Sequence, residues 1–156
     1  MARVDNNPWI RTRIILTACV AVIALTACAS VVTMIRGGAK KPAPSEFGLG
    51  PRASAQGLYT ATLQPAGTLR PRKMQTVHVA LSDSAGRAID GAAITVDGGM
   101  PQHGHGLPTR PRVTKSLGDG VYVIEGVRFN MGGWWELRLA IDGKAGADHV
   151  TFNLAL

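Results

Sequence analysis

Two hydrophobic patterns divide this chain of 156 residues. Residues 14–35 form an apolar run without a charged side chain, which is long enough to span a bilayer as a helix. From residue 57 onward apolar and polar positions alternate with a period of two, which is typical of half-buried β-strands. The chain therefore predicts one membrane helix followed by a β-rich domain over residues 57–156.

The alternation resolves into seven short segments that are separated mostly by turns rich in Gly and Asp. Their approximate ranges are 59–63, 76–81, 92–96, 112–116, 121–128, 134–141 and 150–156. Each strand offers one apolar face, so two sheets must bury these faces against each other. We expect an all-β fold, specifically an immunoglobulin-like antiparallel β-sandwich of about seven strands behind the N-terminal transmembrane or signal-anchor helix.

Two local features refine this expectation. Residues 119–122, Asp-Gly-Val-Tyr, resemble a tyrosine corner, in which the hydroxyl of Tyr122 would bond to nearby backbone. Gly126 interrupts the alternation, because the apolar positions before and after it have opposite parity. This interruption predicts a β-bulge.

The residues around the apolar run indicate where the domain lies. Arg11 and Arg13 directly precede the run, which favours a cytoplasmic tail of residues 1–13 and a C-terminal domain in the periplasm of a bacterial, single-pass inner-membrane protein. In an alternative interpretation, residues 25–28, Leu-Thr-Ala-Cys, are a lipobox, and cleavage would leave Cys28 as a lipidated N-terminus. Both interpretations place residues 36–156 outside the cytoplasmic membrane.

Composition adds three points. Residues 36–56 are rich in Gly, Pro, Ala and Ser, which predicts a flexible linker. Much of the net charge of +7 flanks the apolar run, whereas residues 57–156 hold ten basic and eight acidic side chains, so we expect no nucleic-acid partner. Both cysteines lie within the apolar run, which leaves none in the domain for a disulfide.

One Gly/Pro-rich loop gathers metal-binding side chains, in the order Met100-Pro-Gln-His103-Gly-His105-Gly. In an extended segment residues i and i+2 project to the same side, so both imidazoles face one way. Imidazole binds both oxidation states of copper and the Met100 thioether favours Cu(I), whereas zinc prefers Cys, His and carboxylate. The loop therefore predicts a copper site, with Met131 in a second Gly-rich turn as a candidate further ligand.

The same residues have a plainer interpretation. A Gly-His-Gly sequence near Pro is also typical of an exposed turn or a partner-contact loop, and Met100 and Met131 are equally suited to filling gaps in the core. The isolated histidines, His78 and His149, are expected on strand surfaces.

The adjacent Trp134 and Trp135 must face opposite sides of a strand. Trp135 continues the apolar set, so Trp134 is expected on the solvent side as a partner-binding residue. The sequence has no nucleophile elbow, HExxH motif or phosphate loop, and we expect no enzyme activity.

A family resemblance rests on the His loop, on Gly120-Val-Tyr122, and on the stretch from Val127 to Leu137 that contains Met-Gly-Gly-Trp-Trp. Together they resemble the YtkA-like/FixH group of bacterial membrane-anchored envelope proteins over roughly residues 57–156. The resemblance implies a small immunoglobulin-like sandwich behind one anchor. FixH-type members are linked with a copper-transporting ATPase and with cytochrome oxidase assembly, which implies a partner of that kind.

Two functional hypotheses follow. In the first, a membrane-anchored, periplasm-facing sandwich binds or delivers copper through the His loop. In the second, the domain is a non-metal accessory module of a membrane complex and uses the same loop together with Trp134.

Overall fold

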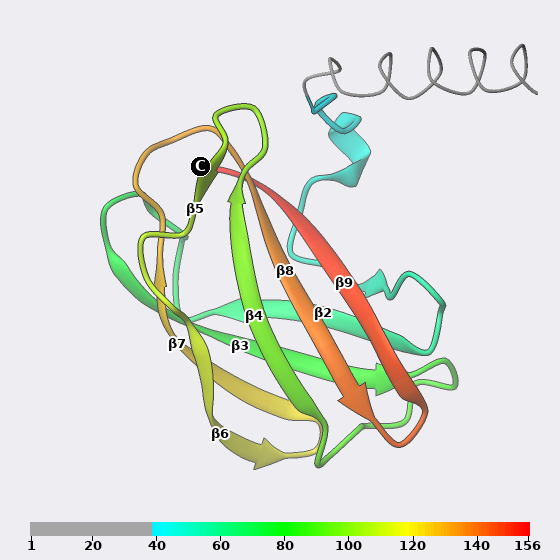
Figure 1. Cartoon of the computed structure of the whole chain (residues 1–156). Helices are drawn as coiled ribbons and strands as arrows, with labels where there is room; N and C mark the ends of the chain where they lie inside the picture. Colours follow the sequence, from blue (N-terminus) through cyan, green and yellow to red (C-terminus); the bar gives the residue numbers. More distant parts are fainter. Residues whose placement is uncertain (1–38) are drawn as a thin grey trace, which may run out of the picture. The chain divides into compact units, whose positions relative to one another are not determined.

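Antiparallel strands make up nearly all the regular structure of residues 39–156, the part of the chain that this computed structural model describes (Figure 1). The predicted cytoplasmic tail, anchor and lipobox cysteine lie outside these residues. Within the described part no helix has the length and apolar character of a bilayer span. The elements are η2 (Pro44–Glu46), β1 (Arg52–Ala53), β2 (Tyr59–Pro65), β3 (Met74–Asp83), β4 (Ala93–Met100), β5 (His105–Gly106), β6 (Arg112–Gly118), β7 (Val121–Arg128), β8 (Trp134–Gly143) and β9 (Gly146–Ala155).

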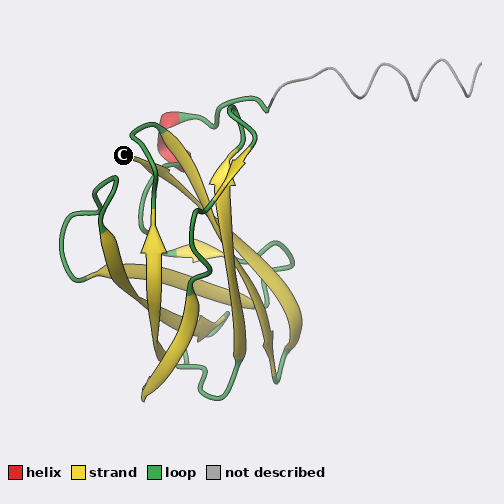
Figure 2. Cartoon of the chain, turned by 60° about the vertical axis from the view of Figure 1, so that its left-hand side comes forward, coloured by secondary structure: helices red, strands yellow, loops and turns green. Residues whose placement is uncertain are grey.

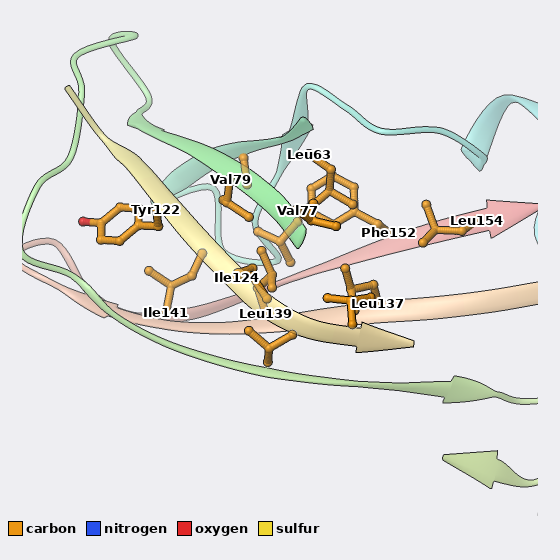
Figure 3. Close-up of a cluster of buried hydrophobic side chains, with 14 of the residues drawn as sticks. Leu63, Val77, Val79, Tyr122, Ile124, Leu137, Leu139, Ile141, Phe152 and Leu154 are labelled. Atoms are coloured by element: carbon orange, nitrogen blue, oxygen red, sulfur yellow. The ribbon is translucent and has the colours of Figure 1, made fainter. Parts of the chain in front are cut away.

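The strands hydrogen-bond in the order β1-β2-β3-β7-β6-β4-β8-β9, and β5 pairs with β4. β6 and β4 share a single residue pair, so the sheet folds over at that junction into two halves. The apolar faces of the halves meet in one core, where Val77 and Ile124 pack with Leu139 and Phe152 (Figure 3). The predicted all-β antiparallel fold is confirmed.

All seven predicted strands are present, as β2, β3, β4, β6, β7, β8 and β9. The predicted bulge is confirmed as well, because the β3–β7 register gains one residue on β7 around Gly126, whose φ is 84°. Ile124 and Val127 are three residues apart and would face opposite sides of a regular strand. The extra residue of the bulge turns both toward the core, and both are fully buried. Tyr122 does bond to backbone, but far along the chain: its hydroxyl donates to Ile89 O at 2.7 Å and accepts from Ala92 N at 3.0 Å.

The predicted linker over residues 36–56 is wrong for its second half. Gly48 N donates to Asn153 O of β9 at 2.9 Å, Leu63 N of β2 donates to Leu49 O at 2.6 Å, and β1 pairs with β2. Composition misleads here because the backbone of a Gly- and Pro-rich segment can bond to a sheet edge without any apolar periodicity. The domain therefore begins at about residue 44, and residues 44–55 bond to both β2 and β9.

Candidate metal-binding hairpin

A pair of glycines in β4 sets the position of the two histidines. β4 continues beyond its predicted end through Gly98 and Gly99 to Met100. A Cβ on Gly98 would lie 2.5 Å from Glu136 O, and one on Gly99 would lie 2.5 Å from His105 O. The glycines therefore let β8 and β5 approach β4 closely on its two sides. This close packing fixes the β4–β5 hairpin against β8.

The hairpin register brings the predicted thioether beside one imidazole. Met100 lies directly opposite His105 in the ladder, and His103 N donates to Met100 O at 3.0 Å across the turn. Directly opposed residues of an antiparallel pair share a face, so the side chains of Met100 and His105 are neighbours. Met100 is only 2% exposed, whereas both histidines are exposed. The loop thus combines a buried sulfur with two accessible imidazoles.

The two imidazole rings are stacked, with their centroids 6.1 Å apart and 4° between their planes. A metal–nitrogen bond of about 2.0–2.1 Å places each ring centroid about 3 Å from a bound ion. Two imidazoles on one ion therefore have centroids at most about 6 Å apart, and the observed separation lies at this upper limit. The nitrogen lone pairs lie in the ring planes, so the stacked rings must turn before both can face one ion, and their exposure leaves them free to do so.

A hollow of about 290 Å³ lies beside the hairpin and is lined by Met100, His105, Glu136 and Arg138, together with Pro101 and four glycines. Arg138 bonds to Asp97 at 2.8 Å and to Glu136 at 3.4 Å. The backbone amide of Gly98 and the Arg138 guanidinium hold the pKa of Asp97 below its usual value. Asp97 is therefore an anion paired with Arg138, and the side chains of the hollow that could hold a metal are His105, Met100 and Glu136.

Glu136, a carboxylate that lines the hollow, was not among the side chains predicted from the sequence. It faces Gly99 across the β4–β8 ladder, so only the strand register brings it to the hollow. In residues 39–156 no three His, Cys, Asp or Glu side chains group as a metal site would require. A site at this hairpin therefore depends on the Met100 thioether or on the two imidazoles alone.

The other predicted residues lie differently. Met131 is 41% exposed in the turn between β7 and β8, so it does not fill a gap in the core, and it does not line the hollow either. His149 is exposed on β9 and His78 is half-buried on β3. The structure therefore brings together Met100, His103 and His105, and leaves Met131 outside the hollow.

The predicted exposure of Trp134 is wrong. Its side chain is 5% exposed, and its Nε1 donates to Asn153 Oδ1 at 3.0 Å. Asn153 Nδ2 donates in turn to Glu46 O at 3.3 Å, and Phe47 forms a bridge to Asn153. The segment predicted as a linker thus bonds to the edge of β9 and to the Asn153 side chain that accepts from Trp134. Burial removes the basis for assigning Trp134 as a partner-binding residue.

Comparison with known proteins gives one match: the sequence model of the YtkA-like family covers residues 53–140. No curated protein and no solved structure matches the chain. The matched range includes the whole β4–β5 hairpin and the glycines that hold it.

Proposed function

Because this chain belongs to the YtkA-like family, we propose that it is an envelope protein whose periplasm-facing β-domain binds or delivers copper at the β4–β5 hairpin. The proposal rests on one observation, the 6.1 Å separation of two exposed imidazoles beside the Met100 side chain. Two imidazoles and a thioether suit copper better than zinc or magnesium. His103 and His105 would bind the ion through their exposed imidazoles, and the buried Met100 thioether would add a soft ligand from the core side.

A copper titration of residues 39–156 tests this proposal. These residues form one compact unit and contain no cysteine, so no thiolate competes for the metal. We expect one equivalent to bind, and the pair His103→Ala/His105→Ala to weaken binding by at least about a hundredfold, or about 2.8 kcal/mol. The matched control, His78→Ala/His149→Ala, removes two other imidazoles and should leave binding unchanged. Equal affinity in both double variants would point to the non-metal accessory module instead.

The anchor is the second part of the proposal. Residues 14–35 would hold the protein in the inner membrane as a single span, and the alternative is a lipoprotein attached through Cys28. Mass spectrometry of the mature N-terminus separates the two. Peptides from residues 1–13 on the mature protein support the retained anchor, whereas a diacylated or triacylated Cys28 establishes the lipoprotein.

We also propose the immunoglobulin-like sandwich as the finer description of the fold. It is supported by the single residue pair that joins the β1-β2-β3-β7-β6 half to the β5-β4-β8-β9 half. The Tyr122 hydroxyl supports it less, because a tyrosine corner bonds to backbone a few residues upstream, and here it bonds to Ile89 and Ala92.

A partner that supplies or receives copper, such as a copper ATPase or an oxidase assembly protein, belongs to the same proposal. It is supported by the exposure of both imidazoles, since an ion held at a hairpin tip is accessible to a second protein. Proximity labelling from the domain in cells tests it. Labelling of a copper-transporting membrane protein would support a delivery role.

A further inference from the structure

Several segments far apart in the sequence meet at the end of the domain that carries the two histidines, which we call the hairpin end. They are residues 39–49, 65–74, 101–104, 129–133 and 154–156. Arg72 N donates to Phe129 O at 2.7 Å, and Gly133 N donates to Leu156 O at 2.7 Å. A Cβ on Gly133 would lie 2.8 Å from Met100 Cε, which connects the hairpin to the same end. In Figure 2 the short helix, the C-terminus and the hairpin are seen together at this end.

Charge is distributed unequally between the two ends of the domain. The hairpin end, with the adjoining Arg128, carries six basic side chains and one acidic side chain, Glu46; the basic ones are Lys40, Lys41, Arg70, Arg72, Lys73 and Arg128. The loops at the opposite end, residues 83–92, 117–120 and 142–146, carry two basic and four acidic side chains. Residues 39–156 as a whole hold thirteen basic and nine acidic side chains, and this charge divides into a positive end and a negative end.

Exposed apolar side chains are concentrated at the hairpin end too. In residues 39–156 four large apolar side chains are exposed, and three of them, Leu49, Met74 and Met131, lie at this end. An open groove of about 530 Å³ beside them is lined mainly by apolar residues, among them Phe47, Leu69, Leu154 and Leu156. Lys41 Nζ lies 5.7 Å from the centre of the Phe47 ring at the edge of this region. Basic side chains and exposed apolar side chains thus occupy the same end of the domain.

The chain also reaches the domain at this end. Only residues 36–43 separate the predicted anchor from η2, because residues 44–55 are bonded to the sheet. From residue 35 to Lys41 the chain spans at most about 22 Å, even when fully extended. An anchor over residues 14–35 would therefore keep the hairpin end close to the bilayer surface, which the longer predicted linker would not have required.

We infer that the hairpin end docks on the anionic phospholipid headgroups of the bilayer, an inference that rests on the membrane anchor proposed above. Basic side chains next to a bilayer are attracted to its anionic headgroups, and exposed apolar side chains enter the headgroup–acyl boundary. Arg70, Lys73 and their neighbours meet lipid phosphates, and Met74, Leu49 and the groove meet the apolar boundary. Docking holds His103 and His105 at the membrane surface, where a membrane-embedded partner can reach them.

The test is hydrogen exchange on the full chain in lipid nanodiscs, comparing zwitterionic phosphatidylcholine with a mixture that contains phosphatidylglycerol. We expect residues 65–74 and 129–133 to exchange more slowly in the anionic discs, and residues 83–92 at the opposite end to be unchanged. Arg70→Gln/Lys73→Gln should reduce this protection by about tenfold or more, because each basic group contributes about a fivefold effect. Lys115→Gln/Lys144→Gln removes the same charge elsewhere and should retain the protection.

The experiment distinguishes a failure of the docking from a failure of the proposed anchor. A chain that stays in the discs but exchanges equally in both lipids overturns the docking and leaves the proposed function standing. A chain that separates from the discs overturns the anchor, and the docking with it. Protection that both double variants reduce equally also overturns the docking, because it would show an effect of net charge alone.

Discussion

At the scale of single residues, the glycines of β4 decide where the proposed ligands lie. Gly99 and Gly106 face each other in the β4–β5 ladder but differ in the space beside them. A Cβ on Gly99 would lie 2.5 Å from His105 O, whereas a Cβ on Gly106 would have no atom closer than 3.9 Å. The hairpin therefore requires glycine at position 99 for close packing and tolerates a methyl group at position 106.

We expect Gly99→Ala to destabilise the domain by about 1–3 kcal/mol, because His105 must move to admit the methyl group. The same movement should weaken copper binding. Gly106→Ala is the matched control and should change neither property by a comparable amount. Thermal unfolding and the copper titration, applied to both variants, measure the effects. Equal stability and affinity in the two variants would show that the hairpin does not hold the site.

Trp134 gives a second prediction at this scale. Trp134→Phe keeps an aromatic ring in the buried position but leaves Asn153 Oδ1 without its donor. We expect a loss of about 1–3 kcal/mol in the free energy of unfolding, because a buried acceptor loses its partner. Copper affinity should be unchanged. Denaturant unfolding of the variant measures the loss, and a variant as stable as the parent would contradict the structural role assigned to Trp134.

At the scale of elements, Asp148 joins β9 to the turn before β2. Its carboxylate accepts hydrogen bonds from Gln56 N at 3.1 Å, Leu58 N at 3.3 Å and His149 N at 2.8 Å. Burial raises the pKa of Asp148, but hydrogen bonds from the Ser54 hydroxyl and from these amides outweigh it, so the pKa lies below the usual 3.8. The ionised carboxylate therefore stabilises the folded state.

The sign of the pH dependence follows from this direction. A lowered folded-state pKa gives stability that is fully present well above pH 3.8 and is lost as the pH falls through the folded-state pKa. We expect Asp148→Asn to be less stable than the parent at pH 7, and the difference to shrink on acidification below pH 3.8. Urea unfolding of both proteins at pH 7 and at pH 3 measures it. A difference that grows in acid would contradict the assignment.

The strand elements could be predicted from sequence because alternation reports directly which side chains face the core. The two short strands β1 and β5, and the residues before β1, could not be predicted from alternation. β1 and the residues before it bond through backbone groups, and β5 is two residues long, so neither leaves a periodic pattern. The error on the linker also explains the error on Trp134. The segment that was predicted as a linker bonds through Glu46 to Asn153, the hydrogen-bond partner of Trp134.

The candidate site was predictable in part for similar reasons. The spacing of His103 and His105 was visible in the sequence, and so was the nearby Met100. The contribution of Glu136 to the hollow depends on the β4–β8 register, which a single sequence does not contain. Met131 is exposed because it lies in the turn between β7 and β8, beyond the end of β7 at Arg128.

At the scale of the whole molecule, residues 39–156 combine a compact β-domain with a hairpin whose two imidazoles are exposed. The basic and apolar hairpin end and the short connection to the predicted anchor are the basis of the proposed docking, in which the histidines lie toward the membrane. In the proposed arrangement the β-sheet holds the two imidazoles in place, and the short connection to the anchor holds the β-domain near the bilayer. The proposed function then depends on whether both rings can bind the same copper ion.

Pulsed electron paramagnetic resonance of residues 39–156 loaded with one equivalent of Cu(II) tests that point most directly, because it counts the imidazoles bound to the metal. We expect two bound imidazoles in the parent domain and one in either His103→Ala or His105→Ala. A parent spectrum with one imidazole or none, or two imidazoles that survive both substitutions, would contradict this expectation.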